Sequence, residues 1–146
     1  MISNNQAPIQ SGFNSKSKSS DVLEGINLKD KLAIITGGYS GIGFETTKGL
    51  KAAGANIIIP AKRTDIACQN LKGILPEKNI LHMDLADLNS VRKFTESVNE
   101  NFSKLDILIN NAGIMACPET RIGNNWESQF AVNHIGHFLL TKGLMP

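Results

Sequence analysis

The segment TGGYSGIG, Thr36 to Gly43, decides the fold class of this chain. Gly37, Gly41 and Gly43 form a G-x-x-x-G-x-G pattern directly after the apolar run LAII. Glycines let the backbone turn sharply and bring its N–H groups close to a ligand. Where a strand enters a helix through such a turn, the positive helix end suits a pyrophosphate. Glycines also serve ordinary tight turns, so the flanking sequence must supply the strand and the helix.

Four short apolar runs supply the strands. They begin at Leu32, Ile57, Ile80 and Ile107, with intervals of 25, 23 and 27 residues. Continuous rather than alternating apolar residues indicate strands covered on both faces, as in a parallel sheet. The intervals are long enough for crossover helices. The sequence therefore predicts an α/β fold, a Rossmann doubly wound parallel sheet cut off after about four βα units.

Apolar residues recur at helical spacing in the intervals between these runs, which predicts helices there. We expect the first helix to stop at Gly54 and the second long helix to follow a cap at Asp87 or Asn89. A shorter helix between them is interrupted by Gly73 and Pro76, and the segment from about Asn124 is also expected to be helical. The residues that set these spacings are Ile42, Thr46, Leu50 and Ala53; Val91, Phe94, Val98, Phe102 and Leu105; and Trp126, Phe130 and Phe138.

The first 28 residues are polar and differ from the rest. The stretch SNNQAPIQSGFNSKSKSS has too little apolar surface to offset the entropy lost on ordering. Within the next stretch, DVLEGI is expected to form one helical turn capped by Ser20 or Asp21. We therefore expect a mobile arm over 1–28 and the dinucleotide-binding part of a Rossmann domain over 29–146.

Bulk composition narrows the functional classes. Hydrophobic residues make up 41% and charged residues 19%, as in an ordinary globular protein. A net charge of +2 gives no support for nucleic acid or an anionic membrane as a partner. No apolar run is long enough to span a bilayer, and the N-terminus lacks the apolar block of a secretory signal. With only two cysteines, Cys68 and Cys117, a cytoplasmic protein is predicted.

A pair of cations indicates which dinucleotide is bound. Sites of this type often carry an acid about 20 residues after the glycine turn, which binds the adenosine ribose. Twenty residues after Gly43 is Arg63, and Lys62 precedes it in PAKRTD. A guanidinium suits a ribose 2′-phosphate, so NADP(H) is favoured over NAD(H). The alternatives are a solvated Lys-Arg pair and, with Asp65 nearby, NAD binding.

Four segments in order resemble the short-chain dehydrogenase/reductase family. They are TGGYSGIG, then HMDL after the third apolar run, NNAG at Asn110 to Gly113, and VNHIGHFLL from Val132 to Leu140. The AKR segment and NHIGHFLL are similar to the retinol-dehydrogenase-like, NADP-preferring members. The resemblance covers about Leu28 to Pro146 and corresponds to the N-terminal half of such proteins. It implies an NAD(P)-dependent oxidoreductase that transfers hydride between nicotinamide and a small carbonyl or alcohol substrate.

The resemblance also implies roles for the matched positions. Gly37, Ser40, Gly41, Ile42 and Gly43 would line the pyrophosphate, and Asp84 and Leu85 would flank the adenine. Asn111, Ala112 and Gly113 would pass under the adenosine ribose, Asn110 would brace the sheet, and Asn133 would be the catalytic residue that holds a water in the proton relay.

Several of these residues could have ordinary structural roles instead. Asp84 could cap a turn, Asn110 and Asn111 could form a plain turn after a strand, and Asn133 could face solvent. Asn133, Gly136, His137 and Leu140 share one helical face. His134 and His137 are three residues apart, but no third ligand lies near them in the sequence, so no metal site is predicted.

The family's remaining catalytic residues have no counterpart. The family pairs a Ser with Tyr-x-x-x-Lys, whereas the single tyrosine here, Tyr39, is followed four residues later by Gly43. We expect the missing C-terminal half to carry that pair, and an unpaired last strand to leave the isolated chain marginally stable. The alternatives are a non-catalytic NADP-binding module and a non-functional truncated remnant. Expected partners are that missing half or a second copy in a homo-oligomer.

Overall fold

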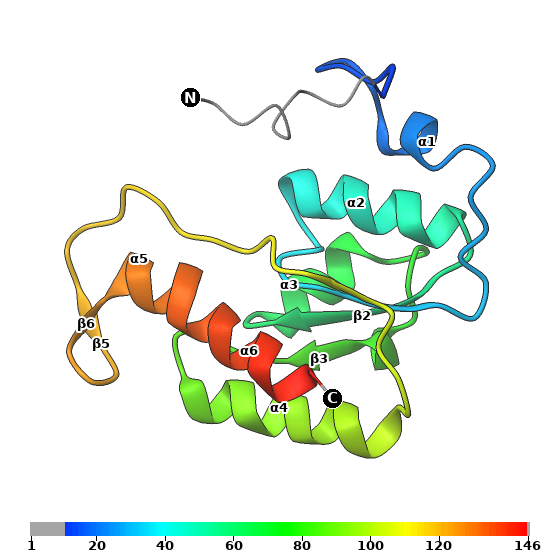
Figure 1. Ribbon diagram of the computed structural model, residues 1–146. Coiled ribbons are helices and arrows are strands. Elements are labelled where there is room, and N and C mark those ends of the chain that lie inside the picture. Colours follow the sequence, from blue (N-terminus) through cyan, green and yellow to red (C-terminus); the bar gives the residue numbers. More distant parts are fainter. Residues whose placement is uncertain (1–10, 146) are drawn as a thin grey trace, which may run out of the picture.

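A four-stranded parallel sheet forms the centre of the computed structural model, which describes residues 11–145. The strands lie in the order β3-β2-β1-β4 (Figure 1). Leu32 pairs with Asn56, Ala33 with Ile107, and Ile59 with Ile80. The predicted doubly wound parallel sheet is confirmed. The strand bounds are β1 Leu32–Ile35, β2 Asn56–Ala61, β3 Ile80–His82 and β4 Ile107–Ile109.

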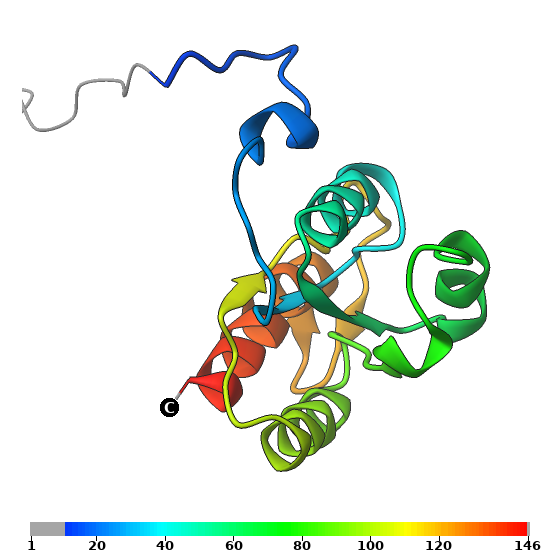
Figure 2. The same ribbon diagram turned by 90° about the vertical axis from the view of Figure 1, so that its right-hand side faces the viewer.

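Helices cover both faces of the sheet, as Figure 2 shows. On one face lie α2 (Gly41–Ala52) and α3 (Thr64–Asn70), and on the other lie α4 (Leu88–Asn101) and α6 (His137–Leu144). A 3-10 turn at Glu77–Asn79 leads from α3 into β3. Successive residues of a strand point to opposite faces, so each apolar run feeds two cores.

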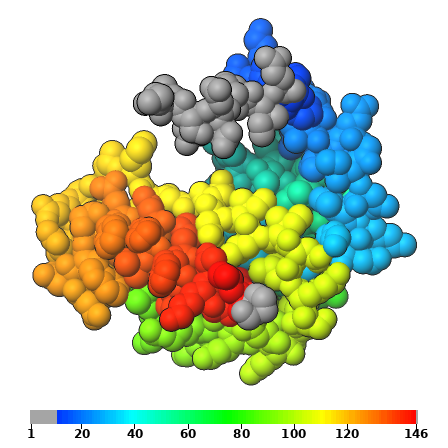
Figure 3. Space-filling view, in the orientation of Figure 1, coloured from blue at the N-terminus to red at the C-terminus, as the bar shows by residue number. Residues whose placement is uncertain are grey.

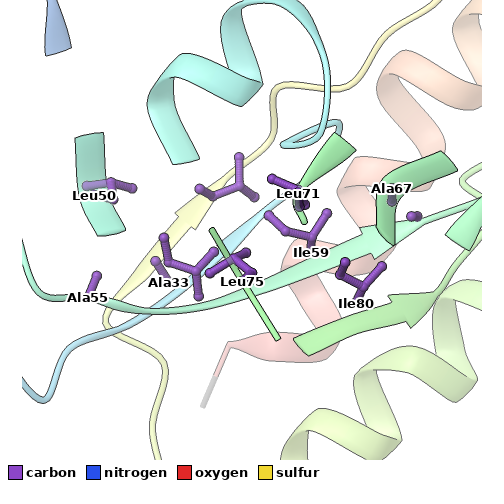
Figure 4. Packing of buried hydrophobic residues seen from close by; sticks show 11 residues of the cluster. Ala33, Leu50, Ala55, Ile59, Ala67, Leu71, Leu75 and Ile80 are labelled. Carbon is purple, nitrogen blue, oxygen red and sulfur yellow. The ribbon is translucent and has the colours of Figure 1, made fainter. Parts of the chain in front are cut away.

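The two cores divide the strand residues between them. Ala33, Ile35, Ile57 and Ile59 pack toward α2 and α3 (Figure 4), while Leu32, Ile34 and Ile58 pack toward α4 and α6. Burying one of these isoleucine or leucine side chains contributes about 1.5–3 kcal/mol. The remaining members of the first core are Leu50, Ala55, Ala61, Ala67, Leu71, Leu75 and Ile80, and those of the second are Met83, Leu85, Val91, Phe94, Val98 and Leu140.

Local signals located the end of α2 and the start of α4. α2 is followed by Gly54 at φ +100°, as the predicted glycine stop requires. The side chain of Asp87 accepts a hydrogen bond from the Asn89 backbone N–H and so caps α4. The expected extension of α4 to Leu105 is wrong, because Phe102 is extended (φ −135°, ψ 130°) and 40% exposed.

The helix predicted from Asn124 begins later than expected. A short antiparallel hairpin comes first, with β5 at Arg121–Ile122 and β6 at Trp126–Glu127, so Trp126 lies in a strand. Its turn contains Gly123 at φ +56° and Asn125 at φ +64°, which helical backbone excludes. Figure 3 shows this region, yellow to orange, as a lobe beside the body.

The last helical segment changes its geometry along its length. Glu127 caps α5 (Ser128–Phe130) by accepting from two backbone N–H groups, and a π-helical turn at Ala131–Gly136 leads into α6. Phe130 and Phe138 are 50% and 60% exposed, whereas Leu140 is fully buried. The expected stripe of aromatic residues therefore faces away from the core, and Leu140 anchors the helix.

Part of the N-terminal segment contacts the body. α1 (Ser19–Val22) begins before the predicted caps, and the Ser19 hydroxyl donates to the Glu45 carbonyl at 3.2 Å. The Leu28 N–H donates to the Ala53 carbonyl at 2.8 Å. Residues 1–10 lie outside the described part of the chain, and the mobility of the arm stays a prediction. Across residues 11–145, no helix has both the length and the apolar character needed to cross a membrane.

Candidate functional site

A cavity of about 180 Å³ lies at the carboxyl ends of the parallel strands. It is lined by Gly37 and Tyr39 after β1, Lys62 after β2, Asp84 and Leu85 after β3, and Gly113 after β4. Its position follows from topology. β2 and β4 flank β1, and the chain crosses the sheet in opposite directions from it, so a crevice opens beyond the end of β1.

The glycine turn has the shape that its sequence predicted. Gly37 and Gly41 have φ of +65° and +52°, a conformation that side chains disfavour. A Cβ on Gly43 would overlap the Gly37 carbonyl oxygen, so the first residues of α2 pack directly on the turn. The Thr47 hydroxyl donates to the Gly38 carbonyl at 2.7 Å and holds the turn from within α2.

The start of α2 is open to solvent. Ser40 stands at the N-cap position, and a Cβ on Gly41 would have no neighbour within 4 Å. Ile42 is 83% exposed, so it does not belong to the packed face of α2 as its spacing suggested. Exposed backbone N–H groups at this helix end can receive an anion.

Thr36 connects the glycine turn to the segment after β4. Its hydroxyl oxygen accepts from the N–H groups of Asn111 and Ala112, each at 2.9 Å, and lies 2.9 Å from Nε2 of His137. The Asn111 side-chain amide donates to the Thr36 carbonyl at 2.9 Å. Asn111 thus shapes the floor of the cavity from below, while Ala112 and Gly113 line it.

Two residues of this network were not assigned this role by sequence reasoning. Thr36 was quoted only as the first residue of the glycine turn, and His137 was considered as a metal ligand and as a residue on the helical face of Asn133. Both ring nitrogens of His137 have protein partners: Nε2 contacts the Thr36 hydroxyl, and Nδ1 contacts the Asn133 carbonyl. Burial lowers the pKa of His137, and the hydrogen bond to Asn133 offsets only part of that effect.

Asp84 combines a structural and a cavity-facing role. One carboxylate oxygen accepts from the Ala86 N–H at 2.9 Å, as the turn-cap interpretation requires. The other lies 2.9 Å from the ammonium group of Lys62. Leu85 is buried, and Gly136 packs so closely on it that a Cβ would lie 2.5 Å from the Leu85 carbonyl oxygen.

Arg63 occupies a different place from Lys62. It is exposed at the N-terminal end of α3, whereas Lys62 lines the cavity. Sequence reasoning selected Arg63 by its distance along the chain from Gly43. The ion pair between Lys62 and Asp84 depends on the neighbouring ends of β2 and β3, which sequence spacing does not reveal.

Asn133 is tied to the segment after β4. Its side-chain oxygen accepts from the Ile114 N–H at 2.9 Å, and its amide nitrogen donates to the Ile114 carbonyl at 2.8 Å. Asn133 is exposed, as the solvent-facing alternative expected, and its side chain also binds the Ile114 backbone through both polar atoms. Asn110 donates from its side chain to the Thr141 hydroxyl at 3.0 Å, which connects the end of β4 to α6.

The chain thus combines a parallel sheet, a glycine turn at the crevice of that sheet, and the NNAG segment below the cavity. Residues 31–146 match the family described as short chain dehydrogenase. This chain belongs to the short-chain dehydrogenase/reductase family. The predicted resemblance is thereby confirmed.

Relatives in the short-chain dehydrogenase/reductase family include proteins from plants and animals. Short-chain dehydrogenase TIC 32 B, chloroplastic, from Brassica napus is 45% identical over 93% of this chain and 44% of the relative. Retinol dehydrogenase 13 from Homo sapiens is 41% identical over 79% of this chain and 36% of the relative. The chain thus spans less than half of these relatives. The predicted similarity to retinol dehydrogenases is confirmed, and the cytoplasmic location stays a prediction.

A solved structure of the family extends the likeness to three dimensions. The Pseudomonas aeruginosa RhlG/NADP active-site complex superposes with a TM-score of 0.67 and 28% identity. The match covers 82% of this chain and 48% of that one. Within residues 11–145, no group of three His, Cys, Asp or Glu residues is arranged to hold a metal ion.

Proposed function

We propose that this chain is the dinucleotide-binding part of an NADP(H)-dependent oxidoreductase. The observation that carries the proposal is the cavity beyond β1, bounded by the glycine turn and by the ends of three other strands. The residues fit the cofactor, because Gly37 lines the cavity without a side chain and a Cβ on Gly41, at the open end of α2, would have no neighbour within 4 Å. The solved NADP complex of RhlG supports the same reading.

Each part of the dinucleotide has residues to receive it under this proposal. The pyrophosphate lies at the open end of α2, against the backbone of Gly37, Ser40, Gly41, Ile42 and Gly43. The adenine lies between Asp84 and Leu85. The adenosine ribose lies over Asn111, Ala112 and Gly113.

Positive charge beside the adenosine favours NADP(H) over NAD(H). Lys62 reaches the cavity, and Arg63 follows it at the start of α3. The Lys62 ammonium lies 2.9 Å from Asp84, on the proposed adenine side of the site, and would receive the 2′-phosphate there. Charge-assisted hydrogen bonds of this kind are the stronger ones in proteins. Asp65, in the first turn of α3, is the acid that weakens this preference.

For the whole protein, we propose oxidation or reduction of a small alcohol or carbonyl compound, with the nicotinamide cofactor accepting or supplying the hydride. Such chemistry also needs a group that moves a proton at the substrate oxygen. Tyr39, the single tyrosine, belongs to the glycine turn and has Gly43 rather than Lys four residues later. We therefore propose that this chain by itself binds the cofactor without turnover.

Titration calorimetry of the purified chain tests the proposal. We expect saturable NADPH binding and at least about tenfold weaker NADH binding, a difference of about 1.4 kcal/mol. A folded sample that binds neither nucleotide would overturn cofactor binding. Equal affinities would overturn the NADP preference alone. Turnover of an alcohol or aldehyde panel would contradict binding without catalysis, and a circular dichroism spectrum lacking helix would indicate a non-functional remnant.

A further inference from the structure

The groups around the Thr36 hydroxyl determine which hydrogen bonds it accepts and which one it donates. Thr36 is 1% exposed, and its oxygen receives two backbone N–H groups, from Asn111 and Ala112. A hydroxyl oxygen has two lone pairs and one hydrogen. Both lone pairs are therefore used, and the hydrogen is left to donate. Nε2 of His137, at 2.9 Å, is a much nearer acceptor than the Ile109 carbonyl oxygen at 3.5 Å.

The second ring nitrogen of His137 then determines its tautomer. Nδ1 lies 3.1 Å from the Asn133 carbonyl oxygen, which can only accept. Nδ1 must carry the hydrogen, and Nε2 must be the acceptor. A proton added at Nε2 would point at the Thr36 oxygen, whose lone pairs are already occupied. The neutral Nδ1–H form is therefore the one that this site stabilises.

We propose that His137, as the neutral Nδ1–H tautomer, is a positioning residue for the cofactor loop. The imidazole orients the Thr36 hydroxyl, and Thr36 in turn holds the backbone of Asn111 and Ala112 beneath the ribose. The functional meaning of this contact rests on the proposed cofactor site, since that loop is its floor. The contact itself does not depend on a bound cofactor.

The same imidazole couples the loop to the helix that carries Asn133. At its other end it donates to the Asn133 carbonyl, within the π-helical turn Ala131–Gly136. Asn133 also holds Ile114 through both polar atoms of its side chain. The segment after β4 is thus attached to the helix through Thr36 and through Ile114, in addition to the contact between Asn110 and Thr141.

Without the imidazole, the Thr36 hydrogen has one other acceptor in the structure. This is the Ile109 carbonyl at 3.5 Å, a distance at the limit for a hydrogen bond. Replacement of His137 by an apolar residue should therefore loosen the loop rather than unfold the sheet. A glutamine side chain carries an acceptor oxygen and a donor NH₂ group and should restore part of the effect.

Nitrogen NMR of the cofactor-free chain at neutral pH gives the first test. We expect the His137 ring to show a protonated Nδ1 and an unprotonated Nε2. The opposite tautomer, or a doubly protonated ring, would overturn the inference. This readout needs no variant and no cofactor, so it is decisive even if substitutions at His137 prevent folding.

Variants give the second test. His137→Leu should raise amide exchange of Asn111 and Ala112 by about tenfold, as expected for one lost buried hydrogen bond. His137→Gln should lie between His137→Leu and the wild type. His134→Leu, on the exposed side of the same helix, should change neither amide. Unchanged loop amides in His137→Leu would contradict the inference.

Cofactor titration separates this inference from the proposed function. If the wild type binds NADPH, His137→Leu should bind it about tenfold more weakly, and equal binding would contradict the positioning role. If the folded wild type binds no nucleotide, the proposed function fails, while the tautomer and the exchange data still decide whether His137 positions the loop.

Discussion

Gly43 lies directly against the carbonyl oxygen of Gly37, so closely that a Cβ on Gly43 would overlap it. The first turn of α2 therefore rests on the backbone of the glycine turn rather than on side chains. This contact holds the first turn of α2 against the glycine turn, which lines the cavity beyond β1 through Gly37 and Tyr39. It is the packing reason for the third glycine of the pattern.

Gly43→Ala should disturb both the turn and the cofactor site. The methyl group meets backbone, which cannot move aside cheaply, so we expect a loss of about 1–3 kcal/mol in the free energy of unfolding. Urea denaturation measures this loss. Gly113→Ala is the matched control, since its Cβ would lie 3.4 Å from Asn133, an ordinary contact. Equal stability of Gly43→Ala and the wild type would show that α2 is not held by this contact.

Lys62→Met and Arg63→Met separate the two cations. We expect each change to weaken NADPH binding by about tenfold and to leave NADH binding within about twofold, because only NADPH carries the 2′-phosphate. Asp84→Asn should weaken both nucleotides, since it alters the adenine side. Calorimetry of each of the three variants with each of the two nucleotides measures these affinities. Equal losses for NADPH and NADH in Lys62→Met would mean that Lys62 acts only through Asp84.

Asn133→Ala should release the segment around Ile114. Two hydrogen bonds to the Ile114 backbone are lost, each contributing about 0.5–1.5 kcal/mol. We expect faster amide exchange at Ile114, with little change in the sheet. His134→Ala on the same helix removes only the stacking contact with Phe130 and should leave the Ile114 amide unchanged. If amide exchange at Ile114 were the same in Asn133→Ala and the wild type, the Asn133 side chain would not hold the Ile114 backbone.

Leu140→Ala and Phe138→Ala test which face of α6 is buried. Leu140 is fully buried in the core between the sheet and α4, so its truncation should cost about 2–5 kcal/mol. Phe138 is 60% exposed, and its truncation should change stability by no more than about 0.5 kcal/mol. Thermal unfolding ranks the two variants. A larger loss for Phe138→Ala would mean that the aromatic side is buried in solution.

Asp106 should make the free energy of unfolding depend on pH in the acid range. The Lys31 ammonium and the Leu32 backbone N–H, both bound to its carboxylate at 2.9 Å, lower the pKa of Asp106 in the folded state. Lys104 adds a weaker attraction. Because the folded pKa lies below the unfolded value of about 3.9, this contribution is full above that pH and is lost as the pH falls through the folded pKa.

Asp106→Asn isolates this contribution. We expect the variant to be less stable than the wild type at neutral pH, with the difference shrinking below about pH 3.9. Denaturation at several pH values measures the difference. Glu119→Gln is the control, because Glu119 pairs with Arg121 on the exposed hairpin rather than at the sheet. A difference that does not change with pH would remove Asp106 as its source.

Local patterns identified the elements that local chemistry controls. Buried parallel strands read as continuous apolar runs, and all four appeared where they were expected. The cap at Asp87 and the stop at Gly54 followed from single residues with strong preferences. At Phe102 and Trp126 the apolar spacing continued although the helix had ended or had not yet begun. Ile42, Phe130 and Phe138 matched a helical spacing, but their side chains are exposed.

The sequence by itself determined a parallel α/β sheet, a glycine turn between its first strand and helix, and the family, because burial and backbone conformation depend largely on neighbouring residues. Only the tertiary structure decided which side chains meet at the cavity. Thr36 and His137 are 101 positions apart, and Lys62 contacts Asp84 only because β2 and β3 end side by side. Such contacts depend on how the chain crosses the sheet, and no local preference of either residue specifies the partner.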